Sequence, residues 1–239
     1  MADETRRRAG SRNGVILGVG VMARAPSSGG KTRLTPHLSE HRLRSLRGAL
    51  LADTVETIAA VRDIDAVLFF TPVEGAREIG EFAPVLPCVA QTGDDLGERM
   101  RAALEHLLQV RGCEAAILVG TDMPWLTAAH FAEARDTLNA FHGVVLGPAD
   151  DGGYYLIAMQ TVQAALFQGI AWGTASVLTD TLRAADLAGV EARLIRAGYD
   201  VDTIEDLRRL ENDLRSAPPE LAPHVRAWFR SGLSPMRDL

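Results

Sequence analysis

The apolar stretch from residue 15 to residue 23 constrains the fold of this chain most. It reads Val-Ile-Leu-Gly-Val-Gly-Val-Met-Ala and contains no charged side chain. Because successive side chains of a strand point to opposite faces, a strand of this composition must be covered on both faces. The stretch therefore predicts a central strand of a parallel sheet with helices on each side.

Segments with strand and helix periodicity alternate along the rest of the chain. Further strands are expected at residues 66–71, 85–91, 115–119, 144–146, 154–158 and 191–195. Helices are expected at 39–61, 74–81, 96–109, 127–141, 162–167, 175–186, 204–215 and in a last short segment to about 230. This order predicts a single-domain, three-layer α/β/α fold with a mostly parallel mixed central sheet. Its ligand should lie at the carboxyl ends of the strands.

Composition sets limits on domains, partners and compartment. We expect a disordered tail at residues 1–13, one domain at 14–215 and a C-terminal helical extension at 216–239. A net charge of -6 argues against a nucleic-acid partner, which would need a basic surface. No stretch reaches the roughly 20 apolar residues of a membrane span. Cys88 and Cys113 lie in apolar surroundings and are expected to be buried thiols, as in a reducing, cytoplasmic compartment.

A basic loop follows the first strand and reads R-A-P-S-S-G-G-K-T-R-L at 24–34. Its small residues leave backbone N–H groups free to approach an anion, and Lys31 and Arg33 add positive charge. A polar surface turn is an alternative interpretation. A third is a Walker A loop, because residues 25–32 fit a relaxed form of that pattern. Pro36 argues against the Walker A loop, since it would fall inside the following helix and cost about 3 kcal/mol there.

Two acidic segments follow later strands. Asp122 lies in Gly-Thr-Asp-Met-Pro, just after the strand at 115–119. Such an aspartate is either a turn or N-cap residue or a ligand for Mg2+ at a substrate phosphate. The segment G-P-A-D-D-G-G-Y-Y at 147–155 is either a hairpin turn or a loop close to a ligand, in which Asp151 could also hold a metal.

Two further segments combine a helix start with charged residues. D-V-D-T-I-E-D-L at 200–207 predicts an N-cap at Thr203, which is compatible with a metal role for Asp202. G-D-D-L-G-E-R at 93–99 places a glycine and Arg99 at a helix start, a potential anion site. The histidines share no spacing, and a Gly-x-Ser-x-Gly elbow is absent, so we assign neither histidine chemistry nor a Ser/His/Asp hydrolase.

Together these segments resemble the DUF2064 family of the GT-A (nucleotide-diphospho-sugar transferase) superfamily, whose members are usually labelled, provisionally, as glycosyltransferases. The resemblance covers about residues 15–214. The basic loop is also similar to that of the more distant 2-phospholactate guanylyltransferases. The motifs that carry the resemblance are, in order, R-A-P-S-S-G-G-K-T-R-L at 24–34, D-L-G-E-R-M at 95–100, G-T-D-M-P-W-L at 120–126, G-P-A-D-D-G-G-Y-Y-L-I at 147–157 and V-D-T-I-E-D-L at 201–207.

The resemblance implies a GT-A (Rossmann-like) fold, a nucleotide partner that is an NTP or an NDP-sugar, a small-molecule acceptor, and Mg2+ or Mn2+ as cofactor. It implies that the catalytic residues are Lys31, Arg33 and Asp122, and that the metal ligands are Asp122 and Asp202. The implied nucleotide-binding residues are Ala25, Pro26, Gly29, Gly30, Lys31, Arg33, Gly97 and Arg99. The residues expected on the substrate side are Asp151, Gly152, Gly153, Tyr154 and Trp172.

Two departures from the family pattern bear on the reaction. The loop is shorter between Pro26 and Lys31, and the acidic turn carries one aspartate, Asp122, where a glycosyltransferase normally has Asp-x-Asp. A single aspartate is common in nucleotidyltransferases. We therefore expect nucleotidyl transfer from an NTP ahead of glycosyl transfer from an NDP-sugar. A non-catalytic nucleotide-binding module and a P-loop NTPase remain as alternatives.

Overall fold

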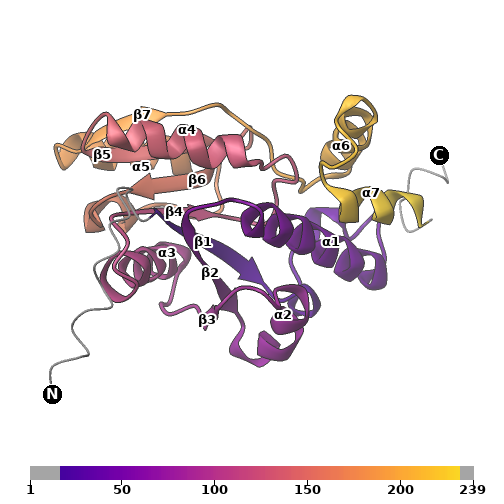
Figure 1. Cartoon of the computed structure of the whole chain (residues 1–239). Coiled ribbons are helices and arrows are strands. Elements are labelled where there is room, and N and C mark those ends of the chain that lie inside the picture. The colour runs from indigo at the N-terminus through magenta and orange to yellow at the C-terminus, as the bar shows by residue number, and fades with distance from the viewer. Residues whose placement is uncertain (1–16, 232–239) are drawn as a thin grey trace, which may run out of the picture.

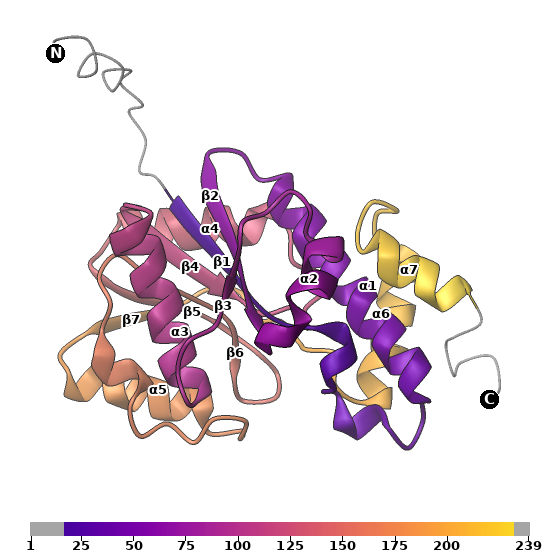
Figure 2. The ribbon, with the colours of Figure 1, turned by 90° about the horizontal axis from the view of Figure 1, so that it is seen from below.

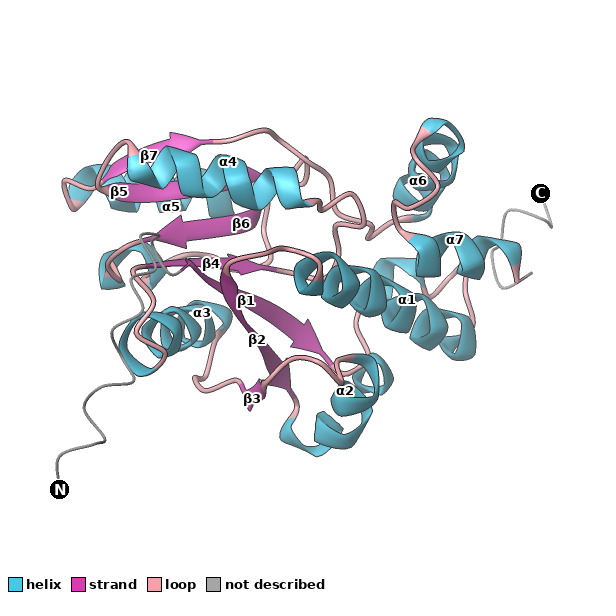
Figure 3. Cartoon of the chain, viewed as in Figure 1, coloured by secondary structure: helices cyan, strands magenta, loops and turns pink. Residues whose placement is uncertain are grey.

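A computed structural model describes residues 17–231, so the tail expected at 1–13 lies outside the described residues. Seven strands form one sheet in the order β3-β2-β1-β4-β6-β5-β7, and only β6 among them runs antiparallel to its neighbours (Figure 3). The prediction of a mostly parallel mixed sheet is confirmed. The strands are β1 (Leu17–Arg24), β2 (Ile64–Thr71), β3 (Cys88–Ala90), β4 (Ala115–Val119), β5 (Gly143–Pro148), β6 (Tyr154–Met159) and β7 (Glu191–Leu194).

Helices cover both faces of the sheet, as the apolar composition of β1 predicts (Figures 1 and 2). One face packs against α1 (Glu40–Ala59), α2 (Ala76–Phe82) and α4 (Ala128–Asn139). The other face packs against α3 (Leu96–Glu105) and α5 (Val177–Leu187). The fold is therefore the three-layer α/β/α arrangement. Among residues 17–231, no helix is both long and apolar enough to span a membrane.

A third apolar cluster lies beside the sheet, where α6 (Ile204–Ser216) and α7 (Pro223–Arg230) pack against α1 (Figure 1). Asp53 on α1 is 4% exposed and accepts hydrogen bonds from the backbone N–H groups of His224 and Val225, at 2.8 and 2.9 Å. These bonds satisfy free N–H groups at the start of α7 and fix it to α1. The region expected as a C-terminal extension thus packs on the main domain as far as it is described.

The predicted helix caps are present. Ser39 caps α1, and Thr127 and Thr203 each form a capping box with the residue three positions later. At Thr203 the partner is Asp206, which takes the place of the usual Glu or Gln. Local side-chain chemistry therefore sets these three helix starts.

Three predictions differ from the structure. The helix expected at 162–167 is a 3-10 turn at Ala164–Phe167, which ends before Gly169 in a left-handed conformation (φ 67°). The strand expected at 85–91 shortens to β3, because this edge strand pairs with β2 alone. Cys88 lies on that edge and is exposed, so the prediction of a buried thiol is wrong for Cys88 and confirmed for Cys113.

The topology places a crevice between β1 and β4. From β1 the chain continues through α1 to β2 on one side, and from β4 it continues through α4 to β5 on the other. Val119 ends β4 opposite Val21, so the residues after β4 run beside the last residues of β1. In open α/β sheets this switch point, at the carboxyl ends of the strands, is where ligands bind.

Candidate functional site

A cavity of about 460 Å³ opens at this crevice. Its size is in the range of small-molecule sites. The basic loop after β1 and the acidic turn after β4 meet here, although they are far apart in sequence. The charged residues that line the cavity are Arg24, Lys31, Arg47, Arg99, Asp122, Asp200 and Asp202.

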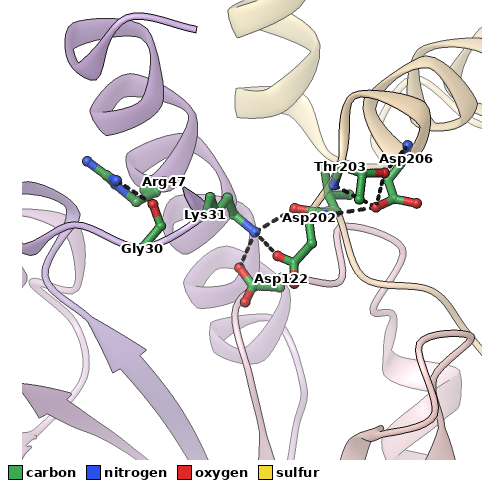
Figure 4. A network of polar contacts seen from close by, with 8 residues as sticks. Gly30, Lys31, Arg47, Asp122, Asp202, Thr203 and Asp206 are labelled. Carbon is green, nitrogen blue, oxygen red and sulfur yellow. Dashed lines mark hydrogen bonds and ion pairs between the residues drawn. The ribbon is translucent and has the colours of Figure 1, made fainter. Parts of the chain in front are cut away.

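Lys31 is the centre of the site (Figure 4). Its Nζ lies 2.6 Å from Asp122 Oδ1 and 3.2 Å from Asp202 Oδ1, and it donates a hydrogen bond of 2.6 Å to the carbonyl oxygen of Val201. The Lys31 side chain is 5% exposed, whereas those of Asp122 and Asp202 are 48% and 37% exposed. The lysine thus joins the acidic turn to the segment before α6.

The backbone of the loop explains how Lys31 reaches this position. Gly29, Gly30 and Lys31 all have positive φ, at 82°, 104° and 54°. Glycine adopts this conformation without strain, which allows the chain to turn sharply before the lysine. Among the hydrogen bonds of residues 17–231, none uses the N–H group of Gly29 or Gly30, so both remain available to an anion.

The start of α1 rules out a Walker A loop. That motif continues directly into a long helix from its lysine. Here Thr32–Leu34 form only a 3-10 turn, and α1 begins at Glu40 after the Ser39 cap. The P-loop NTPase hypothesis is therefore wrong, for the reason that Pro36 suggested.

Two side chains from the helices behind the loop hold it in place. Arg47 of α1 is buried and donates a 2.9 Å hydrogen bond to the carbonyl oxygen of Gly30. Glu78 of α2 accepts hydrogen bonds from the backbone N–H and the hydroxyl of Ser27, at 3.0 and 2.5 Å. Burial opposes the charge on Glu78, but the bonds from Ser27 and the guanidinium of Arg44 outweigh it and lower its pKa. These contacts within the protein hold the loop at two points.

The site concentrates opposite charges in a partly buried place. Burial favours a neutral Lys31, but Asp122 and Asp202 outweigh burial and raise the pKa of its ammonium. Burial also raises the pKa of Asp200 to about 7, and the negative charges of Asp122, Asp151 and Asp202 add to that rise. Two carboxylates thus contact the single positive charge of Lys31, and a third acidic side chain lies near them.

The donor set fits a divalent hard cation. Magnesium prefers oxygen ligands, often one or two protein carboxylates completed by water and substrate phosphates. Asp122 and Asp202 supply two such carboxylates, and their contact with one ammonium shows that both face the same point. Within residues 17–231 no group of three or more metal-ligating side chains is positioned to hold a metal. The protein would therefore provide two carboxylate ligands, and water and a substrate would provide the remaining ligands.

The structure brings some of the predicted site residues together and leaves others apart. The cavity contains Gly29, Gly30, Lys31, Arg99, Asp122, Tyr154 and Asp202. Other predicted residues lie outside its lining, namely Ala25, Pro26, Arg33, Gly97, Asp151, Gly152, Gly153 and Trp172.

The contacts and exposure of most of these outlying residues show where they lie instead. Arg33 is exposed, and Ala25 is a buried residue of the loop itself. Gly97 packs against the indole of Trp172, where an added Cβ would lie only 2.7 Å from the ring. Residues 151–153 form the turn of the β5–β6 hairpin, in which Asp151 accepts a hydrogen bond from the N–H group of Gly153. The hairpin interpretation of that segment is confirmed.

Sequence reasoning missed several residues of the cavity. Asp200 could have been found from its Asp-x-Asp spacing to Asp202. Arg24, at the end of β1, and Gln91, just after β3, could have been found from their positions at strand ends. The amide of Gln91 donates to the carbonyl oxygens of Ala23 and Phe69 and so joins three strands. No sequence pattern indicated that Arg47 belongs to the site, because it lies in the middle of a helix.

Comparison with known proteins identifies relatives of this fold. The chain is 28% identical over 185 residues to phosphoenolpyruvate guanylyltransferase of Sphaerobacter thermophilus, which covers 75% of this chain and 86% of the relative. A solved structure from Desulfovibrio desulfuricans G20, provisionally described as a nucleotide-diphospho-sugar transferase, has a TM-score of 0.82 and 26% identity. This match covers 93% of this chain and 97% of that one.

A more distant structure shares the fold. It is 4-diphosphocytidyl-2C-methyl-D-erythritol synthase from Anaerococcus prevotii DSM 20548, with a TM-score of 0.57 and 12% identity over 84% of this chain and 99% of that one. The fold is thus that of the class that nucleotidyltransferases and nucleotide-sugar transferases share. Within that class the chain belongs to the DUF2064 family, described as an uncharacterized protein conserved in bacteria, whose profile matches residues 54–174. The resemblance drawn from the sequence is confirmed.

Proposed function

We propose that this protein transfers a nucleotidyl group from a nucleoside triphosphate to a phosphorylated or sugar-like small molecule and releases pyrophosphate. The observation that carries this proposal is the seating of Lys31 on Asp122 and Asp202, at the switch point between β1 and β4. A basic loop and two carboxylates at one point suit a substrate that arrives with several phosphates and a cation.

The chemistry would be largely electrostatic. An acceptor oxygen attacks the α-phosphorus, the bond from that phosphorus to its bridging oxygen breaks, and pyrophosphate leaves. The N–H groups of Gly29 and Gly30 and the guanidinium of Arg99 line the cavity and would bind phosphate oxygens. Mg2+ or Mn2+ on Asp122 and Asp202 would supply further neutralisation of the phosphate charge. Tyr154 also lines the cavity and is our candidate for the acceptor side.

The relative from Sphaerobacter thermophilus supports this reaction and suggests the first substrates to test. We would incubate the protein with Mg2+ and each of the four common NTPs, in the presence of phosphoenolpyruvate or another phosphorylated acid. Pyrophosphate release and the mass of the product are measured together. Turnover with GTP that requires both the acceptor and the metal is the expected result.

Glycosyl transfer from an NDP-sugar is a second candidate, favoured by the match to the Desulfovibrio structure at a TM-score of 0.82. The two reactions differ in the nucleotide that binds. A thermal-shift series with NTPs and NDP-sugars, with and without Mg2+, separates them. If NDP-sugars bind and no NTP does, nucleotidyl transfer is wrong. If nucleotides bind and an Asp122→Asn variant binds them equally well with or without metal, the protein is a non-catalytic binding module.

A further inference from the structure

Lys31 is the only lysine among the 239 residues of the chain, which otherwise uses arginine for its positive charges. The two side chains are not interchangeable, because lysine ends in a compact ammonium with three rotatable donors on a flexible stem. The surroundings of Lys31 match that shape. Three oxygens, from Asp122, Asp202 and the carbonyl of Val201, lie within 3.2 Å of its Nζ.

This arrangement leaves Lys31 no donor for a phosphate. An ammonium has three N–H donors, and three protein oxygens already surround it. The side chain is also 5% exposed, so little of its surface faces the cavity that it lines. In the position observed, the lysine neutralises the carboxylates and binds no substrate.

The same two carboxylates are the ones that a divalent cation would use. Lys31 and a metal bound by these carboxylates would therefore compete, because Lys31 Nζ already lies against one oxygen of each. Arg47 holds the backbone of the loop through the carbonyl oxygen of Gly30, so an exchange would be a movement of the lysine side chain. There is free space beside the two glycines that precede Lys31. A Cβ added at Gly29 would meet no atom within 4 Å, and one at Gly30 only the Arg24 side chain at 3.8 Å.

We propose that Lys31 is an exchangeable internal cation. It occupies the Asp122–Asp202 site while the protein is free, and it moves to the phosphates when a divalent cation and a nucleoside triphosphate enter together. Metal alone then binds weakly, and metal and nucleotide bind as one unit. The nucleotide half of this inference rests on the proposed function, whereas the competition between lysine and metal does not.

A single lysine makes the exchange directly observable. Protein labelled with 15N-lysine gives one side-chain ammonium signal in a nitrogen–proton NMR spectrum. We expect a protected signal in the free protein, because Nζ is buried and held by three oxygens. Mg2+ with a non-hydrolysable GTP analogue should shift that signal, and Mg2+ alone should not at the same concentration. A free protein without a protected signal, or a signal unmoved by Mg2+ with the analogue, would overturn the proposal.

Metal affinity tests the competition without a nucleotide. Mn2+ binding to the free protein is measured by electron paramagnetic resonance for the wild type, Lys31→Met and the control Arg33→Met. The control removes one positive charge from the same loop, at an exposed position outside the cavity. We expect Lys31→Met to bind Mn2+ roughly tenfold more tightly than the wild type or more, and Arg33→Met to match the wild type.

The outcomes separate this inference from the proposed function. Equal or weaker Mn2+ binding by a folded Lys31→Met variant refutes the competition, even if the enzyme makes product from GTP. Tighter Mn2+ binding by Lys31→Met, together with no turnover of any NTP by the wild type, keeps the competition and removes nucleotidyl transfer. Should Lys31→Met fail to fold, the ammonium spectrum of the wild type still decides.

Discussion

The substitution Asp122→Asn separates a role in chemistry from a role in stability. At the 2.6 Å between Lys31 Nζ and Asp122 Oδ1, two charges attract by several kcal/mol at an effective dielectric constant of about 20. The Asp122 side chain is 48% exposed, however, so solvent reduces the net contribution of the pair to about 1 kcal/mol. The substitution also removes the repulsion of Asp122 by Asp200 and Asp202, which offsets part of the attraction lost with Lys31. We expect the free energy of unfolding to change by at most about 1 kcal/mol.

The effect on turnover should be much larger. Loss of one of the two carboxylates that would hold the metal at the phosphates should lower kcat/KM by about 10²–10³-fold, or roughly 3–4 kcal/mol of transition-state stabilisation. Pyrophosphate release measures turnover, and urea unfolding measures stability. Asp65→Asn is the matched control. Asp65 pairs with Arg111 at 2.6 Å near the amino end of β2, whereas the cavity lies at the carboxyl ends of the strands. A folded Asp122→Asn protein that keeps more than about a tenth of the wild-type activity would refute the role of Asp122.

Three further variants test other parts of the structure. Arg47→Met removes the guanidinium that holds the basic loop, and steady-state kinetics should show a roughly tenfold rise in KM for the nucleotide, with a smaller change in kcat. Burial and a nearby guanidinium lower the pKa of His130, whose Nδ1 accepts the N–H of Thr127. Wild-type stability should therefore fall as the pH drops below about 6.5, and His130→Gln, which keeps a capping box without titrating, should lose that dependence in urea unfolding at pH 7.5 and 5.5. Gly97→Ala should cost about 2 kcal/mol in thermal unfolding and change the tryptophan emission, because the new Cβ would meet the Trp172 ring at 2.7 Å.

The fold could be predicted from the sequence because each of its elements carries a local signal. Apolar runs such as 115–119 give strands, and the serine and threonine caps at 39, 127 and 203 give helix starts. The errors fall where local signals are weak. The segment at 162–167 has buried apolar residues but only a 3-10 turn, and β3 is short because its length depends on one neighbouring strand.

The site was predictable in its residue types and less so in its contacts. Lys31, Asp122 and Asp202 each stand beside a strand end or helix start, so their convergence follows from the topology of a parallel sheet. No local pattern says that the lysine binds the two carboxylates, because Lys31 and Asp202 lie 171 positions apart. Arg47 was missed for the same reason, since its partner Gly30 belongs to another element.

The third apolar cluster explains why these distant residues meet. Leu34, at the end of the basic loop, and Val201, which precedes Asp202, are both fully buried in this cluster with the inner faces of α1, α6 and α7. The cluster therefore fixes both sides of the Lys31–Asp202 contact, while the sheet itself fixes Asp122 through β4. A loop held on one side by packing and on the other by Arg47 can keep its backbone in place while the long, flexible side chain of its lysine changes partners. The C-terminal helices thus contribute to the geometry of the site although none of their residues lines the cavity.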